Sequence, residues 1–329
     1  MGGMNLLRDR ASPFGRSATV ALSVAVGLGV VALINSALAR SAERRNLPKG
    51  TFVEVDGVRL HYLEKGSGSA VVLLHGNQSL LDDFEISGLF DLLARNHRVI
   101  AVDRPGFGHS ERPRQKVWTA FAQAALIRKT LSQLGVEKPV IVAHSWGTLV
   151  ALAHAVDYAA DTGALLLLSG YYFRTKRLDA ILASLPAVPF IGDLLRYTIS
   201  PILGWLTGPM ILKQVFAPSK VTERVKREFP FSMLLRPSQI RATAGDAAQM
   251  VPAATSLARH YGQLTMPIVI MAGRGDRIVA VSPHPRRLHA AISGSTLQIM
   301  DTGHMVHHEF PEEVAAAVGK LQAELREAV

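Results

Sequence analysis

Residues 140–148 read VIVAHSWGT, and this stretch decides the fold because it joins a strand, a sharp turn and a helix. The β-branched run at 140–142 predicts a buried strand, and the Ala-rich segment 149–160 predicts the helix that follows. Ser145 lies between them in a small–x–Ser–x–Gly pattern, which raises a serine hydroxyl above the edge of a sheet. The positions two before and two after the serine must be small. Gly147 meets this requirement, and Ala143 departs from glycine by a single methyl group.

Strands and helices alternate on both sides of this stretch. A hairpin is expected first, because residues 51–55 and 58–63 flank the turn Asp56-Gly57. Further strands are expected at 70–74, 98–102, 139–143, 164–169, 267–271 and 296–300, with helices at 84–95, 117–134, 283–292 and 311–328. Fully apolar strands that alternate with helices indicate an α/β fold with a parallel sheet covered on both faces.

The segment 171–265 interrupts this alternation. It contains eight of the seventeen prolines and twelve basic against five acidic side chains, and it also has long apolar stretches at 181–189 and 199–211. We expect it to form a helical cap over the carboxyl ends of the strands, where ligands bind in open α/β sheets. The chain then divides into a first core part at 51–170, the cap, and a second core part at 266–329.

The N-terminal region predicts a membrane anchor. Residues 17–39 contain no charged side chain, and 23 helical residues at about 1.5 Å each span roughly 35 Å, enough to cross a bilayer. A basic arm at 1–16 precedes this segment and a polar linker at 40–50 follows it. The alternative is a secretory signal peptide cleaved after Ala39, but the apolar run is longer than usual for one. The flanking charges are nearly balanced, so the side of the membrane stays open.

The amino-acid composition limits the kinds of binding site and partner that can be expected. The 329 residues include no cysteine, so disulfides and thiolate metal sites are excluded. The net charge of +10 is concentrated in residues 1–50, with a net charge of +5, and in the cap, with +7, which suits either an anionic membrane surface or simple solubility. The basic residues are not interleaved with stacking aromatic residues, and we expect no nucleic-acid partner.

Ser145 needs a neighbouring base, and the base needs a carboxylate that orients it. Asp276 and His304 each follow an expected strand, in the chain order serine, aspartate, histidine. Loops after parallel strands share one edge of the sheet, so we expect these three side chains to converge. His307 and His308 are alternative bases, and with His304 they offer a three-histidine zinc site that no patterned acid completes.

With these pieces the sequence resembles the serine hydrolases of the α/β-hydrolase family. The matching motifs are His75-Gly76, Asp103-Arg104-Pro105-Gly106-x-Gly108-x-Ser110, Ala143-x-Ser145-x-Gly147, Gly273-x-x-Asp276 and Gly303-His304. The resemblance implies a mostly parallel eight-stranded sheet flanked by helices, with a helical cap. It also implies Ser145 as nucleophile, His304 as base, Asp276 as its partner, and the backbone N–H groups of Asn77 and Trp146 as an oxyanion hole. Family members that open epoxides or remove halides have aspartate at the nucleophile position, and the serine here argues against both reactions.

The expected function is therefore hydrolysis of an ester or related acyl bond through an acyl-enzyme intermediate. We expect neither a cofactor nor a metal, and a small acyl compound as substrate. The apolar cap and the anchor favour a lipid-like one. Two alternatives stay open: a hydrolase of C–C bonds in diketones that uses the same triad, and a non-catalytic binding protein on the same fold. The substrate itself cannot be identified from the cap sequence.

Overall fold

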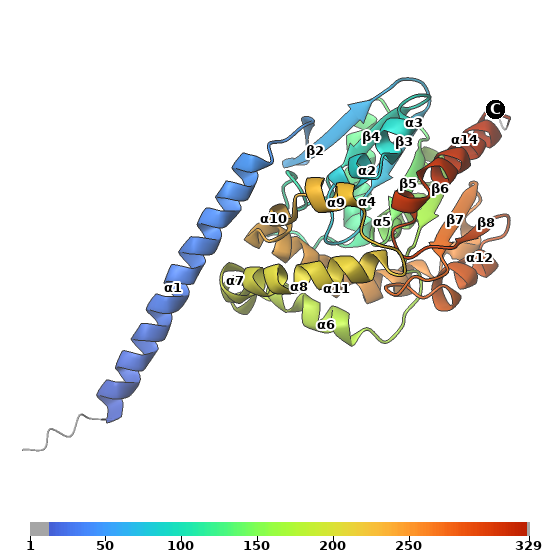
Figure 1. Ribbon diagram of the computed structural model, residues 1–329. Helices are drawn as coiled ribbons and strands as arrows, with labels where there is room; N and C mark the ends of the chain where they lie inside the picture. The colour runs from blue at the N-terminus through green and yellow to red at the C-terminus, as the bar shows by residue number, and fades with distance from the viewer. Residues whose placement is uncertain (1–12, 328–329) are drawn as a thin grey trace, which may run out of the picture.

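The computed structural model describes residues 13–327, with side chains from Ser17 onward, so most of the basic arm expected at 1–16 lies outside the described residues. One eight-stranded sheet runs through the body in the order β1-β2-β4-β3-β5-β6-β7-β8 (Figure 1). Its strands are β1 (Thr51–Val55), β2 (Val58–Lys65), β3 (Ala70–Leu74), β4 (Arg98–Val102), β5 (Val140–His144), β6 (Ala164–Leu168), β7 (Ile268–Gly273) and β8 (Thr296–Met300). Strands β1 and β2 are antiparallel to their neighbours, and the remaining pairs are parallel. The expected fold class is confirmed.

Helices cover both faces of the sheet. They are α2 (Asp82–Ile86), α3 (Leu89–Leu93), α4 (Ala120–Gln133), α5 (Gly147–Asp157), α12 (Arg287–Ala291), α13 (Val306–Glu309) and α14 (Pro311–Glu327). Alternate residues of each strand point to opposite faces, so β3 sends Val72 and Leu74 toward α4 and α5. It sends Val71 and Leu73 toward α2, α3 and α14. Two hydrophobic cores therefore pack against opposite faces of the central strands and fix the positions of their carboxyl ends.

A run of helices connects β6 to β7. It consists of α6 (Leu178–Ser184), α7 (Ile191–Tyr197), α8 (Ile199–Phe216), α9 (Glu223–Glu228), α10 (Phe231–Leu234) and α11 (Pro237–Leu257). Helix α11 reaches the carboxyl ends of the strands, because the carbonyl of its residue Thr243 accepts from the Asn77 side chain in the loop after β3. Its last turns join the core, where Ala254 and Leu257 are fully buried.

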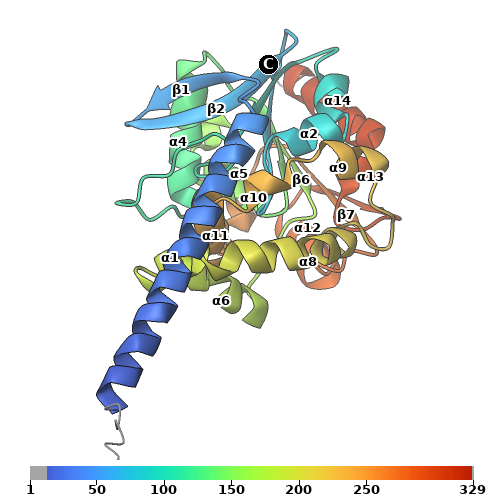
Figure 2. The ribbon, with the colours of Figure 1, turned by 60° about the vertical axis from the view of Figure 1, so that its left-hand side comes forward.

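Helix α1 (Pro13–Arg45) extends away from the body, and its C-terminal end contacts it (Figures 1 and 2). The helix runs six residues past Ala39, so the linker expected at 40–50 is helical up to Arg45. The sequence 40–45 contains no glycine or proline, and Ala42 is buried against Met233 of α10, which favours continued helix. Within α1, the segment Ser17–Arg45 is long and apolar enough to cross a membrane; a signal sequence would have the same character.

Candidate active site

Ser145 occupies the sharp turn between β5 and α5. Its φ is 51°, a left-handed conformation that is unfavourable for a residue with a side chain. The turn is held by the Ser145 N–H, which donates to the Leu168 carbonyl at 2.8 Å. A Cβ at Gly147 would lie 2.5 Å from the Leu74 carbonyl oxygen, so a larger residue is excluded there. Within the buried run from β5 to α5, Ser145 is the residue that stays partly exposed.

His304 and Asp276 form a hydrogen-bonded chain with this serine. Nε2 of His304 lies 2.9 Å from Oγ of Ser145, and Nδ1 of His304 lies 2.7 Å from Oδ2 of Asp276. Oδ1 of Asp276 accepts from the backbone N–H groups of Ile278 and Val279 at 2.8 and 2.9 Å. The Asp276 side chain is 1% exposed, so its orientation is fixed by these bonds. The three residues expected to converge do lie together at the edge of the sheet.

Two backbone N–H groups border the serine. Asn77 follows β3 and Trp146 follows Ser145, and neither backbone N–H donates to a protein acceptor within residues 13–327. A Cβ placed on Gly76 would lie 3.1 Å from Cβ of Ser145, which puts the loop after β3 directly against the turn. These two N–H groups are the ones that the family resemblance implies as an oxyanion hole.

Arg104 is completely buried beneath these two loops. Its guanidinium donates to the carbonyls of His75 and Gly76 at 2.8 and 2.9 Å. It also forms an ion pair with Asp246 of α11 at 2.7 Å and lies 4.7 Å from the centre of the Trp146 ring. The Trp146 indole N–H donates to the Asp246 carbonyl at 2.9 Å. One buried cation therefore touches both loops that flank Ser145.

The His75 side chain stabilises the loop after β3 through two hydrogen bonds. Its Nδ1–H donates to the Gly76 carbonyl at 2.8 Å, and its Nε2 accepts from the Arg104 backbone N–H at 3.0 Å. Burial, assisted by the Arg104 charge, lowers the pKa of His75 to about 4. The ring is therefore neutral at physiological pH, which agrees with the one-donor, one-acceptor pattern of its hydrogen bonds.

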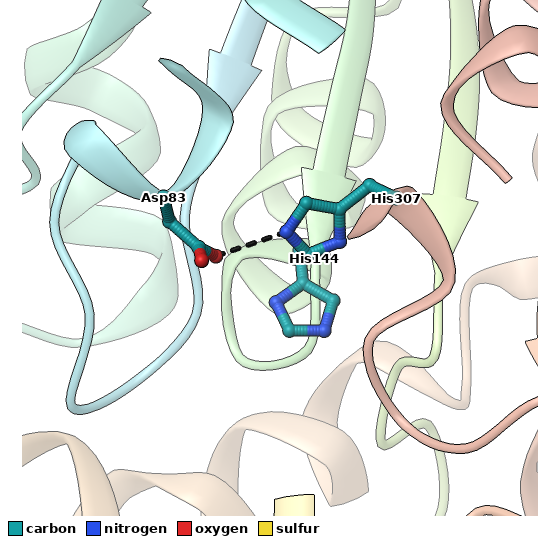
Figure 3. A group of neighbouring side chains, drawn as sticks. All are labelled: Asp83, His144 and His307. Atoms are coloured by element: carbon teal, nitrogen blue, oxygen red, sulfur yellow. Dashed lines mark hydrogen bonds and ion pairs between the residues drawn. The ribbon is translucent and has the colours of Figure 1, made fainter. Parts of the chain in front are cut away.

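A second aspartate–histidine group, which the sequence reasoning missed, is formed by Asp83, His307 and His308; Figure 3 shows the first two of these side chains beside His144. Asp83 of α2 is buried and accepts from Nε2 of His307 at 3.0 Å and from Nε2 of His308 at 2.7 Å. Burial opposes ionisation of Asp83, but the two imidazoles hold its pKa well below the usual range. His144, just before Ser145, donates from Nε2 to the His304 carbonyl at 3.1 Å. The available sequence signal was the cluster of histidines around 304, which gives no indication of Asp83.

Among the described residues, this second group is where three possible metal ligands come close together. The three-histidine arrangement considered from the sequence does not form, because His304 turns to Ser145 while His307 and His308 turn to Asp83. Asp83, His144 and His307, drawn in Figure 3, instead have ligand atoms that all lie within 4.8 Å of one another. Nε2 of His144 and Nε2 of His307 are both engaged in hydrogen bonds, whereas Nδ1 of each ring is buried without a hydrogen-bond partner among the described residues.

A cleft of about 380 Å³ lies next to the loop that carries Asp276. It is lined from the cap by Thr175, Arg177 and Gln214, and from the loop after β7 by Arg277, Ile278 and His284, among others. Ile278 also donates its backbone N–H to Asp276. The cleft thus opens between the segment that connects β6 to β7 and the loop after β7.

Comparison with known proteins gives matches over most of the chain. An uncharacterized protein of Mycobacterium tuberculosis is 30% identical over 80% of this chain and 78% of its own length. The soluble epoxide hydrolase of a Corynebacterium strain is 28% identical over 83% of this chain and 96% of its own. Among solved structures, a membrane phospholipase A is 21% identical with a TM-score of 0.65, covering 95% of this chain and 98% of the other.

The enol-lactonase of Burkholderia xenovorans is 18% identical with a TM-score of 0.67, covering 83% of this chain and all of the other. At this identity the similarity to both solved structures shows the fold. The family model described as the alpha/beta hydrolase family matches residues 71–317, which include Ser145, Asp276 and His304. The chain therefore belongs to the α/β hydrolase family and is a hydrolase.

Proposed function

We propose that the protein is a membrane-anchored serine hydrolase that cleaves esters or related acyl compounds through Ser145, His304 and Asp276. The observation that carries this proposal is the continuous chain from Asp276 to His304 to Ser145, with distances of 2.7 and 2.9 Å. These are hydrogen-bond lengths, and Nε2 of His304 is the nitrogen placed to remove the hydroxyl proton.

The reaction follows from this arrangement. Oγ of Ser145 attacks the substrate carbonyl while Nε2 of His304 takes its proton, and Asp276 stabilises the imidazolium that forms. The Asn77 and Trp146 N–H groups bind the negative oxygen of the tetrahedral intermediate. His304 then gives the proton to the departing alkoxide, which leaves as an alcohol. A water molecule, deprotonated by His304, releases the acid from Ser145 in the same manner.

An acyl ester is favoured by the nature of the nucleophile and by the relatives. The enol-lactonase and an esterase from Exiguobacterium antarcticum share the fold. A meta-cleavage product hydrolase shares it as well, which keeps C–C bond hydrolysis as the alternative. The anchor and the similarity to a membrane phospholipase A support a substrate with an acyl chain. We propose the single-pass anchor at 17–39 and the cap at 171–265 as expected from the sequence, with the anchor extended as one helix to Arg45.

The test uses the full-length protein purified in detergent. A fluorophosphonate probe should label wild-type protein and leave Ser145→Ala unlabelled. A panel of acyl esters of increasing chain length should be hydrolysed by the wild type alone. Labelling without ester turnover, but with cleavage of a vinylogous diketone, would move the reaction to C–C hydrolysis. Absence of both labelling and turnover in a folded protein would leave the non-catalytic alternative and overturn the proposal.

A further inference from the structure

Exposed apolar side chains gather on one part of the cap. Within the described residues, fifteen of the twenty-five exposed large apolar side chains lie between Leu178 and Ile211, on α6 to α8. We call this set the cap apolar face. Phe190 is 88% exposed and Trp205 is 70% exposed. Eight others lie on α1 and only two lie elsewhere in the described residues. Exposed apolar side chains concentrated in this way on successive helices mark an interaction site.

The cap apolar face lies where α1 leaves the body. The side-chain amide of Asn35 donates to the carbonyls of Tyr197 and Thr198, both at 2.9 Å, at the junction of α7 and α8. Beyond this point α1 continues alone, past α6 and α8 (Figures 1 and 2). The part from Ser17 to Ile34 is about 27 Å long at 1.5 Å per residue, close to the thickness of a hydrocarbon core. A bilayer spanned by this part ends at the level of α7 and α8.

The shape of the face suits the surface of a bilayer better than its interior. The segments Leu178–Ala187 and Ile191–Tyr197 together are apolar enough for a span, but they meet at an angle of 91°. Basic side chains border the face, with Arg174 and Lys176 exposed before α6 and Lys213 exposed near the end of α8. On α1, Arg40, Arg44 and Arg45 are exposed on the body side of Asn35. Apolar side chains bordered by cations are typical of segments that lie in the headgroup region.

We propose that the cap apolar face docks on the phospholipid bilayer that α1 enters, with Phe190 and Trp205 inserted at the boundary between headgroups and acyl chains. The cleft next to Asp276 is lined by Thr175 and Arg177 before α6 and by Gln214 of α8, so it opens beside this face. The docked cap thereby presents the cleft to acyl chains of the membrane. This last step rests on the proposed function, whereas the docking does not.

The absence of cysteine makes a direct test straightforward. Phe190→Cys and Trp205→Cys, each in the full chain, are labelled with an environment-sensitive fluorophore and reconstituted in phosphatidylcholine nanodiscs with or without an anionic lipid. Ala323→Cys is the control, because Ala323 is also exposed and belongs to α14, which lies far from α1 in Figure 1. Labels at 190 and 205 should shift to the blue and be quenched by lipid-attached quenchers. The label at 323 should respond only to an aqueous quencher.

Two outcomes would overturn the docking. The labels at 190 and 205 could be as accessible to the aqueous quencher as the label at 323. Alternatively, they could be shielded without contact with lipid quenchers and become exposed on dilution in detergent, which would place a second copy of the chain on the face.

An activity measurement distinguishes a failure of membrane docking from a failure of the proposed hydrolysis. The double variant Phe190→Ser/Trp205→Ser should hydrolyse a short soluble ester at the wild-type rate, while hydrolysis of a long-chain ester embedded in nanodiscs should fall by about tenfold or more. Equal rates on both substrates would contradict the delivery of acyl chains from the membrane. Inactivity of the wild type on the soluble ester would instead count against the proposed function and leave the fluorescence result intact.

A separate observation concerns Arg104. The carbonyl of Gly76 and the N–H of Asn77 belong to one planar peptide unit and point in opposite directions. The Arg104 guanidinium and the His75 ring both donate to that carbonyl, at 2.9 and 2.8 Å. Holding the carbonyl therefore aims the Asn77 N–H. Arg104 also lies against the ring of Trp146, whose backbone N–H is the second donor nominated for the oxyanion hole.

We infer that Arg104 is a positioning residue for the oxyanion hole, an inference that rests on the proposed function. Arg104→Lys keeps the charge but loses the forked geometry, so the two carbonyls are no longer held together. We expect kcat to fall by about tenfold to hundredfold with KM little changed, because the lost alignment matters in the transition state. Binding of a boronic acid, which forms a tetrahedral adduct with Ser145, should weaken by a similar factor.

A boronic acid affinity that stays at the wild-type value while kcat falls would overturn this role. If Arg104→Lys does not fold, Asp246→Asn provides the same comparison, because it loosens the guanidinium from the opposite side. A purely structural role would lower the melting temperature of both variants without any parallel between kcat and boronic acid affinity.

Discussion

Two aspartate–histidine groups lie side by side at the carboxyl edge of the sheet, and they use opposite nitrogens of the imidazole ring. Asp276 binds Nδ1 of His304, so Nε2 at the tip of the ring is left for Ser145. Asp83 instead binds Nε2 of His307 and of His308. The nitrogen left over on His307 is Nδ1, which is buried without a partner within the described residues. We therefore expect the nitrogen that the aspartate binds, rather than the mere presence of an aspartate–histidine pair, to determine which group can act as the base for a nucleophile.

The strongest test of this comparison removes the members of the first group. Ser145→Ala and His304→Ala should each lower kcat by about 10³-fold or more, because the nucleophile or its base is lost. His307→Ala, taken from the second group, is the matched control and should retain ester hydrolysis. Steady-state kinetics on a soluble ester measures all three. If His307→Ala abolished activity and His304→Ala did not, the roles of the two groups would be reversed.

Asp276→Asn should have a somewhat smaller effect, of about 10²- to 10⁴-fold on kcat. The amide group can donate to Nδ1, which favours the tautomer with its proton on Nε2 and so blocks proton removal from Ser145. Fluorophosphonate labelling of this variant should be slowed by a similar factor, whereas its melting temperature should change little. A labelling rate equal to the wild type would show that Asp276 does not orient His304.

Asp83→Asn tests the second group through stability. The pKa of Asp83 is held below its unfolded value, so its charge stabilises the fold at every pH above about 3.9. Loss of this buried charge should lower the free energy of unfolding by about 3 kcal/mol at pH 7, with kcat within threefold of wild type. The difference should shrink as the pH falls below about 3.9, because the unfolded chain then takes up a proton that the folded carboxylate does not, and it should vanish once the folded carboxylate is protonated too. Chemical denaturation in detergent at several pH values measures it, and a difference that grew in acid would contradict an ionised Asp83.

His144 should give the smallest effect, because it lies between the two groups without belonging to either. Its ring centre is 4.8 Å from that of His304 and 4.6 Å from that of His307. His144→Ala removes the donor to the His304 carbonyl, and we expect a decrease in kcat of about threefold to tenfold from loosened geometry. His144→Gln offers an amide N–H at a similar distance and should recover most of the loss. Equal losses in both variants would assign the effect to packing.

The central strands and the candidate triad could be predicted because both depend on local patterns. The strands Ala70–Leu74, Arg98–Val102 and Thr296–Met300 occur as expected, since short apolar runs bounded by turn residues define them. Ser145, Asp276 and His304 could be paired from sequence because each follows a strand, and parallel strands end at the same edge. The hydrogen-bonded chain between them agrees with that expectation.

Features that depend on tertiary contacts could not be predicted. The helix expected at 84–95 is broken into α2 and α3 at Gly88, whose φ of 84° interrupts the helix. Asp83 resembles an ordinary acidic residue of a first helical turn, and its partner His307 lies 224 residues away. The helical continuation of α1 to Arg45 is stabilised by contacts with α10 and by an ion pair between Glu43 and Arg236. Local sequence patterns carry no information about contacts between residues so far apart in the chain.

The bond between Asn35 and the cap has a consequence for the maturation of the chain. Cleavage after Ala39 would remove Asn35 and leave the carbonyls of Tyr197 and Thr198 without their donor. The Tyr197 carbonyl would lose its side-chain donor at the α7–α8 junction, and this cost favours a mature chain that retains α1. If α1 is retained, its Asn35 side chain permanently stabilises the junction of α7 and α8 in the cap. A mature N-terminus at Arg40, found by mass spectrometry, would show that the cap must re-form its α7–α8 junction after processing.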